Sequence, residues 1–168
     1  GAGWPAFLGG AALAAEMRAT SAEHLEYISP EGIAALAATG TVAVSLPLAS
    51  LYLREPYLPA RRLLDAGVPV AVATDFNPGS APSYHLPLAL SLACLNQGMT
   101  PQEALMGCTT VAARAVARAD RIGSLLSGFQ ADIAVIDAPS LNHWLYHFSP
   151  NACVAVFKNG QPLLNKLT

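Results

Sequence analysis

The fold is decided by the stretch Val68-Pro69-Val70-Ala71-Val72-Ala73-Thr74-Asp75. Its first seven residues carry no charge, most are apolar, and an aspartate follows them directly. A strand that is apolar on both faces is typical of a parallel sheet covered by helices on both sides. We therefore predict a buried parallel strand over residues 68–74, with Asp75 at its carboxyl end.

On both sides of this stretch, strand and helix patterns alternate. Extended segments are expected to end near His24 and at Pro47. The helices are expected over residues 11–17, 30–38, 60–66, 86–97 and 100–118. Three βα units cannot close an eight-stranded barrel, and an open three-stranded parallel sheet would leave long unpaired edges. The predicted class is therefore α/β, as half of a βα-barrel that belongs to a larger chain.

The last part of the sequence follows a different pattern. Gly123 and Gly128 mark turns, and an apolar strand is expected between Asp132 and Asp137. The segment 154–158 then runs into Asn159-Gly160, a dipeptide that favours a type I′ hairpin turn. We predict two domains: residues 1–120 form the partial βα-barrel, and residues 121–168 form a small β appendage.

Composition argues against several functional classes. Charged residues make up only 12% of the chain, about half of what a free-standing domain carries, so much of the surface is expected to be buried against a missing partner. The net charge is −2, and the largest basic cluster is the Arg61-Arg62 pair, which argues against nucleic-acid binding. The 22 uncharged residues from Gly32 to Leu53 are interrupted by Gly40 and Pro47, which favours helix, turn and strand over a membrane span.

The cysteines give an indirect indication of the cellular compartment. Cys94, Cys108 and Cys153 are odd in number and lack Cys-x-x-Cys spacing. This pattern favours free thiols over disulfides or a structural zinc cluster, and a cytoplasmic location is expected.

His24 and Asp75 are the polar residues most clearly placed for chemistry. Each follows an expected strand, and functional groups of βα-barrels lie at the carboxyl ends of strands. A carboxylate there can bind a metal ion and accept a proton from an attacking water. The alternative, equally open from Asp75 alone, is an aspartate that caps its own loop.

The loop after Asp75 adds further polar groups. Asn77 offers donors and acceptors, Gly79 permits close backbone approach, and Ser80 adds a hydroxyl, while prolines 78 and 82 stiffen the loop. Such a loop can hold the carboxylate or amide of a small ligand. It can also form an anion-binding nest, or be a plain turn.

Several segments together resemble a known family. The segment Ala73-Thr74-Asp75-Phe76-Asn77-Pro78-Gly79-Ser80 resembles the last-strand motif of the imidazolonepropionase family. Residues 8–14, 21–26 and 40–47 are similar to other parts of the same family. Residues 109–113, 123–132 and 158–160 resemble the tail shared by amidohydrolases that carry a β-sandwich. The resemblance implies the C-terminal half of a (β/α)8 TIM-like barrel with a small β-sandwich appendage.

The resemblance also implies a reaction. Asp75 would be a ligand of one catalytic Zn²⁺ or Fe³⁺ ion, and His24 would orient the attacking water or stabilise the developing oxyanion. Asn77, Gly79 and Ser80 would bind the substrate. The implied reaction is hydrolysis of the cyclic amide of 4-imidazolone-5-propanoate to N-formimidoyl-L-glutamate, in histidine degradation.

The implied partner is the missing N-terminal half of the barrel. That half is expected before Gly1, with a His-x-His pair and a third histidine as the other metal ligands, so the 168 residues alone are expected to be inactive. The sequence leaves open whether the chain forms a homodimer. The alternative functions are another cyclic-amide hydrolase or deaminase of the superfamily, or a non-catalytic half-barrel that binds an anion.

Overall fold

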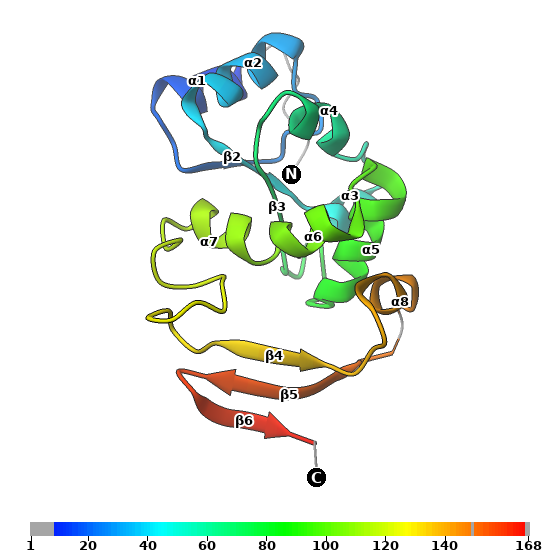
Figure 1. The fold of residues 1–168 in the computed structure, drawn as a ribbon. Coiled ribbons are helices and arrows are strands. Elements are labelled where there is room, and N and C mark those ends of the chain that lie inside the picture. The colour runs from blue at the N-terminus through cyan, green and yellow to red at the C-terminus, as the bar shows by residue number, and fades with distance from the viewer. Residues whose placement is uncertain (1–8, 149, 167–168) are drawn as a thin grey trace.

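A three-stranded parallel sheet forms the centre of the first part of the chain (Figure 1). The computed structural model describes residues 9–148 and 150–166. The strands are β1 (Ser21–Glu23), β2 (Val42–Ser45) and β3 (Val70–Val72), in the order β1-β2-β3. Every residue of β2 and β3 is buried, as predicted for parallel strands covered on both faces. The backbone hydrogen bonds between β3 and β2 run from the Pro69 carbonyl to the Ala73 amide, so the strand is somewhat shorter than the predicted range 68–74.

Local signals mark the starts of two of the helices before β3, α2 (Pro30–Thr39) and α3 (Pro47–Leu53). The other two are α1 (Gly10–Glu16) and α4 (Ala60–Asp65). The Ser29 hydroxyl caps α2 by accepting the Gly32 amide at 3.1 Å, as predicted. Helix α3 was not predicted. It begins at Pro47 directly after β2, because proline is well suited to the first turn of a helix.

Two helices replace the one predicted over residues 100–118. After α5 (Leu86–Gln97) come α6 (Pro101–Gly107) and α7 (Thr110–Ala115). The prediction of one continuous helix was wrong. Thr109 leaves helical geometry at φ −124° and ψ −94°, and its hydroxyl donates to the Leu105 carbonyl at 2.7 Å. Gly107 also lies against β3, where an added Cβ would sit 3.0 Å from the Val72 side chain.

A three-stranded antiparallel sheet makes up the last part of the chain. It consists of β4 (Ile133–Ile136), β5 (Cys153–Lys158) and β6 (Gln161–Asn165), with helix α8 (Leu141–Tyr146) between β4 and β5. Asn159 and Gly160 both have positive φ, 52° and 75°, which confirms the type I′ hairpin. A sandwich needs two facing sheets, and the described residues of this part form one, so the sandwich is not confirmed. The domain division at residue 120 stays a prediction.

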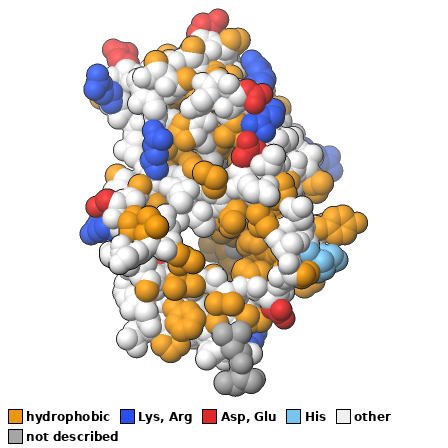
Figure 2. All heavy atoms as spheres, in the orientation of Figure 1, with side chains coloured by type: hydrophobic (Ala, Val, Ile, Leu, Met, Phe, Trp, Pro, Cys, Tyr) orange, Lys and Arg blue, Asp and Glu red, His pale blue; other side chains and the backbone are white. Residues whose placement is uncertain are grey.

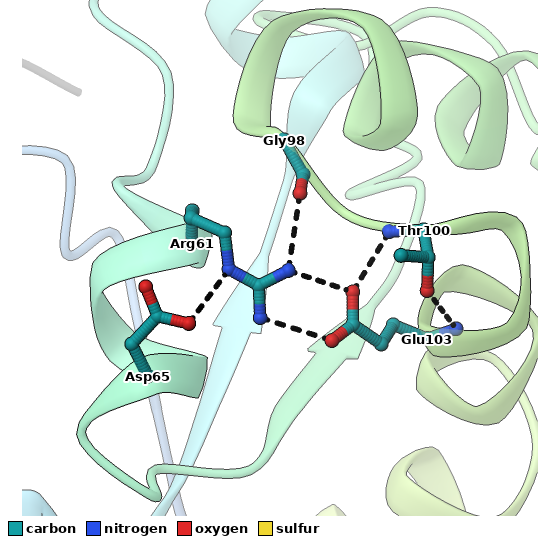
Figure 3. Close-up of polar contacts among 5 residues, drawn as sticks. All are labelled: Arg61, Asp65, Gly98, Thr100 and Glu103. Atoms are coloured by element: carbon teal, nitrogen blue, oxygen red, sulfur yellow. Dashed lines mark hydrogen bonds and ion pairs between the residues drawn. The ribbon is translucent and has the colours of Figure 1, made fainter.

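A polar network joins α4 to the start of α6 (Figure 3). The Arg61 guanidinium donates to both carboxylate oxygens of Glu103, at 3.0 and 2.9 Å, and also to Asp65 and to the Gly98 carbonyl. Glu103 in turn completes the predicted capping box with Thr100. These bonds hold the pKa of Glu103 at about 2, with the Arg61 hydrogen bond as the largest cause.

The surface is unusually apolar for so small a chain. Figure 2 shows hydrophobic side chains gathered over the middle and lower part of one face, around a hollow. Leu125, Leu126 and Leu163 are among the exposed large side chains, at 79%, 61% and 71% exposure. The expectation that part of this surface is covered in a larger assembly stays a prediction. Among the described residues, no helix has the length and apolarity needed to cross a membrane.

Candidate functional site

His24 and Asp75 lie beyond the same edge of the parallel sheet. Glu23, Val44 and Ala71 form one row across the three strands, and His24 comes one residue after that row in β1. Asp75 comes three residues after the end of β3. Because β1 and β3 both pair with β2, they lie about two strand spacings, roughly 10 Å, apart. The two residues therefore follow alternate strands of one sheet, at the same end of it.

Both residues have an uncommon backbone conformation. His24 has φ 55° and Asp75 has φ 52°, in the left-handed region that favours glycine. Neither side chain has a hydrogen-bonding or ionic partner among the residues that the structure describes. His24 is exposed and Asp75 is half-buried. Strained residues with free polar side chains are frequent at functional sites, because structural requirements alone do not favour them.

The side chain of Asn77 organises the loop that follows Asp75. Its Nδ2 donates to the Asp75 carbonyl at 2.6 Å and to the Ser80 hydroxyl at 2.9 Å. Its Oδ1 accepts the Gly79 and Ser80 amides at 2.9 and 2.8 Å. A bridge between Asn77 and Ala81 closes the loop. The loop is thus held by its own asparagine.

These bonds determine which groups remain for a ligand. The Gly79 and Ser80 amides, which would form an anion nest, already donate to Asn77. The nest alternative therefore loses its support. The Asp75 carboxylate and the Gly79 carbonyl remain open to a ligand. The Ser80 hydroxyl accepts from Asn77 Nδ2 at 2.9 Å and donates to Asn77 Oδ1 at 3.2 Å, so it can donate to a ligand only in place of the longer bond.

Tyr27 lies in the loop that carries His24 and is exposed. Its hydroxyl donates to Glu55 Oε2 at 2.8 Å, and this bond is the main reason why the pKa of Tyr27 is raised. The bond joins the loop after β1 to the segment after α3, and so it supports the loop that carries His24. The two residues are 28 positions apart, so no local pattern could have identified the pair.

A cleft of about 890 Å³ lies beside this loop. It is lined by α1, β1 and the start of α2, and its polar lining residues include Glu23, His24, Tyr27 and Glu31. Asp75 is not among the lining residues. A ligand in this cleft would therefore lie near His24 and not near Asp75. The candidate site is better described as the end of the parallel sheet beyond which both residues lie.

The other histidines have structural roles. His85 Nδ1 accepts the Leu88 amide at 3.1 Å and caps α5. His143 and His147 have the i, i+4 spacing of some helical metal sites, but their rings stack with centroids 4.2 Å apart. His147 Nδ1 also lies 2.9 Å from the His143 carbonyl.

The Asp75 side chain is suited to be one ligand of a metal ion. A carboxylate is a suitable oxygen ligand for zinc or iron, and the Asp75 carboxylate has no competing partner among the described residues. The same residues hold no group of three or more histidine, cysteine, aspartate or glutamate side chains that could enclose a metal. The described residues can therefore supply Asp75 as one ligand of a metal site, but not a complete site.

Comparisons with known proteins identify relatives of this chain. The chain is 46% identical over 159 residues to an imidazolonepropionase of Fusobacterium nucleatum, with 95% of this chain and 38% of that protein covered. It is 48% identical over 160 residues to an imidazolonepropionase of Treponema denticola, with 95% and 39% covered. The chain thus spans less than two-fifths of the length of these relatives, and the resemblance to the imidazolonepropionase family is confirmed.

A solved structure gives the same result for the fold. The chain is similar to a zinc-bound adenosine deaminase from Xanthomonas campestris, with a TM-score of 0.77, 26% identity, and 87% of this chain and 37% of that one covered. The sequence profile of the amidohydrolase family matches residues 6–163, nearly the whole chain. The chain belongs to the amidohydrolase family.

Proposed function

We propose that this chain is the C-terminal part of an enzyme that hydrolyses the cyclic amide of 4-imidazolone-5-propanoate to N-formimidoyl-L-glutamate in histidine degradation. The observation that carries the proposal is the pair of free side chains, His24 and Asp75, at one edge of the parallel sheet. The similarity to imidazolonepropionases over 95% of the chain supports the choice of substrate. In this proposal the parallel sheet is part of a (β/α)8 barrel, which the preceding part of the enzyme completes.

Each residue of the site has a proposed task. Asp75 would hold a zinc or iron ion, which supplies the Lewis acidity that polarises the ring carbonyl and acidifies a water molecule. The Asp75 carboxylate would accept a proton from the attacking water and pass it to the ring nitrogen as the C–N bond breaks. His24 would stabilise the negative charge that develops on the carbonyl oxygen.

The loop would hold the substrate. The Ser80 hydroxyl would donate to the substrate in place of its 3.2 Å bond to Asn77 Oδ1, and the Gly79 carbonyl would accept from a ring N–H. Both groups follow Asp75 within a loop that its own hydrogen bonds fix, so little ordering is needed on binding. Deamination is the alternative reaction, favoured by the similarity to an adenosine deaminase structure.

The test is a substrate comparison on the complete enzyme that carries this sequence. Purified enzyme with measured metal content is offered 4-imidazolone-5-propanoate and adenosine separately, and the products are identified by mass spectrometry. We expect N-formimidoyl-L-glutamate from the first and no reaction with the second. Ammonia release from adenosine without opening of the imidazolone ring would favour a deaminase and refute the proposal.

A further inference from the structure

The loop that carries His24, residues 24–28, begins in a strained conformation. His24 has φ 55°, and a non-glycine residue keeps such a conformation only where surrounding contacts hold the backbone. Within the loop, Leu25 is buried at 7% exposure, and the Ile28 amide donates to the Leu25 carbonyl at 3.1 Å. These contacts close a turn directly after His24. The His24 side chain itself is exposed, so the backbone of the loop sets its position.

Tyr27 connects this turn to a different element. Its hydroxyl donates to Glu55 Oε2 at 2.8 Å, and among the described residues no other side chain of residues 24–28 forms a hydrogen bond outside the loop. The acceptor is held in turn, because the Glu55 amide donates to the carbonyl of the buried residue Ser50 at 3.0 Å. Ser50 lies in α3, which begins directly after β2. The bond therefore joins the segments that follow two neighbouring strands, β1 and β2.

We propose that Tyr27 and Glu55 are positioning residues that hold His24 in place for the reaction. This inference rests on the proposed function, in which His24 stabilises the charge that develops on the carbonyl oxygen. Such stabilisation depends closely on geometry, and a displacement of about 1 Å can cost on the order of 100-fold in rate. Loss of the bond leaves the turn and the buried Leu25 in place, so its effect should be smaller than that.

The hydroxyl of Tyr27 is the group that makes this connection. Its ring is 41% exposed, so packing alone holds it only in part. The hydrogen bond to Glu55 raises the pKa of Tyr27 above its ordinary value of 10.0. The hydroxyl therefore keeps its proton, and the bond, throughout the neutral range of pH. Tyr27→Phe removes this bond and keeps the ring.

The test compares variants of the complete enzyme in kcat, KM and metal content. For Tyr27→Phe and Glu55→Ala we expect kcat to fall by about 3- to 10-fold, with KM and metal content within about twofold of wild type. Glu55→Gln keeps an oxygen that can accept the Tyr27 hydroxyl, so it should retain most of the rate. Tyr52→Phe is the matched control, because Tyr52 is a 59% exposed tyrosine of α3 whose hydroxyl has no partner among the described residues.

A second comparison asks whether the effect passes through His24. In a His24→Ala enzyme, Tyr27→Phe should change kcat by less than about twofold, because the residue that it positions is gone. A 3- to 10-fold loss that persists in that background, or a raised KM with unchanged kcat, would show that Tyr27 acts in another way and would overturn the inference.

Hydrogen exchange provides a measurement that does not depend on activity. Amides of residues 25–28 should exchange faster in Tyr27→Phe and in Glu55→Ala, and at the wild-type rate in Tyr52→Phe. A wild-type enzyme that does not open the imidazolone ring would overturn the proposed function. In that case, faster exchange would still support the hold on the His24 loop, and unchanged exchange would overturn this inference as well.

Discussion

Removing the Arg61 guanidinium should loosen the start of α6. Arg61 makes two bonds to Glu103 and one each to Asp65 and the Gly98 carbonyl, so it joins α4 to the α5–α6 turn (Figure 3). Arg61→Met keeps the aliphatic stem, which lies close to Gly98, and removes only the charged head. Glu103→Gln keeps an oxygen for the Thr100 amide and removes the charge. The two single variants and the double variant form a thermodynamic cycle.

The size of the effect follows from the pKa of Glu103. Its value of about 2, against an ordinary 4.5, corresponds to at most about 3 kcal/mol of stabilisation of the ionised form. The Thr100 bonds contribute part of this shift. The side chains are 40% and 30% exposed, so solvent screens the pair further. We therefore expect a coupling free energy of about 1–1.5 kcal/mol between Arg61 and Glu103.

Hydrogen exchange of the complete enzyme measures this coupling locally. Amides around Thr100–Gly107 should exchange about 5- to 12-fold faster in Arg61→Met, since 1.4 kcal/mol corresponds to tenfold. Arg62→Met is the control, because Arg62 is the exposed neighbour on the same helix. Arg61→Met should have little further effect once Glu103→Gln is present. Additive effects of the two substitutions would refute the coupling.

Four further outcomes are expected. Asp75→Asn in the complete enzyme should lower turnover by several powers of ten and weaken metal binding, and near-normal activity with full metal content would remove Asp75 from the site. His24→Ala should keep its metal and lose about 10²–10³ in kcat, whereas a parallel loss of metal would make His24 a ligand. The stability that ionised Glu103 contributes is fully present above pH 4.5 and is lost as pH falls towards about 2, because folding lowers the pKa of Glu103. Melting curves of wild type and Arg61→Met should therefore converge below pH 4.5. The 168 residues alone should be inactive, bind metal poorly and self-associate, and a folded monomer with stoichiometric metal and turnover would contradict the half-barrel proposal.

Local signals made much of the fold predictable. The Ser29 cap, the capping box at Thr100, the helix end at Gly98 and the Asn159-Gly160 turn each depend on residues within about four positions of one another. The break between α6 and α7 was missed because part of its cause is not local. Gly107 lies against β3, which is more than 30 residues earlier in the chain.

The positions of the candidate residues could be predicted from the sequence, but their contacts could not. His24 and Asp75 were identified because they directly follow strand patterns, and parallel strands bring such residues to one edge. Asn77 was recognised as polar, but the saturation of its amide depends on the three-dimensional path of the loop. The bond between Tyr27 and Glu55 depends on the packing of two loops, so the sequence contains no pattern for it.

The left-handed conformations at His24 and Asp75 have a consequence for protein engineering. A non-glycine residue in this region costs on the order of 1 kcal/mol, and glycine relieves most of that cost. A library selected only for heat resistance should therefore enrich glycine at positions 24 and 75. If His24 and Asp75 have the roles proposed above, the resulting variants would survive heating and lack activity, so a stability screen needs a catalytic assay beside it.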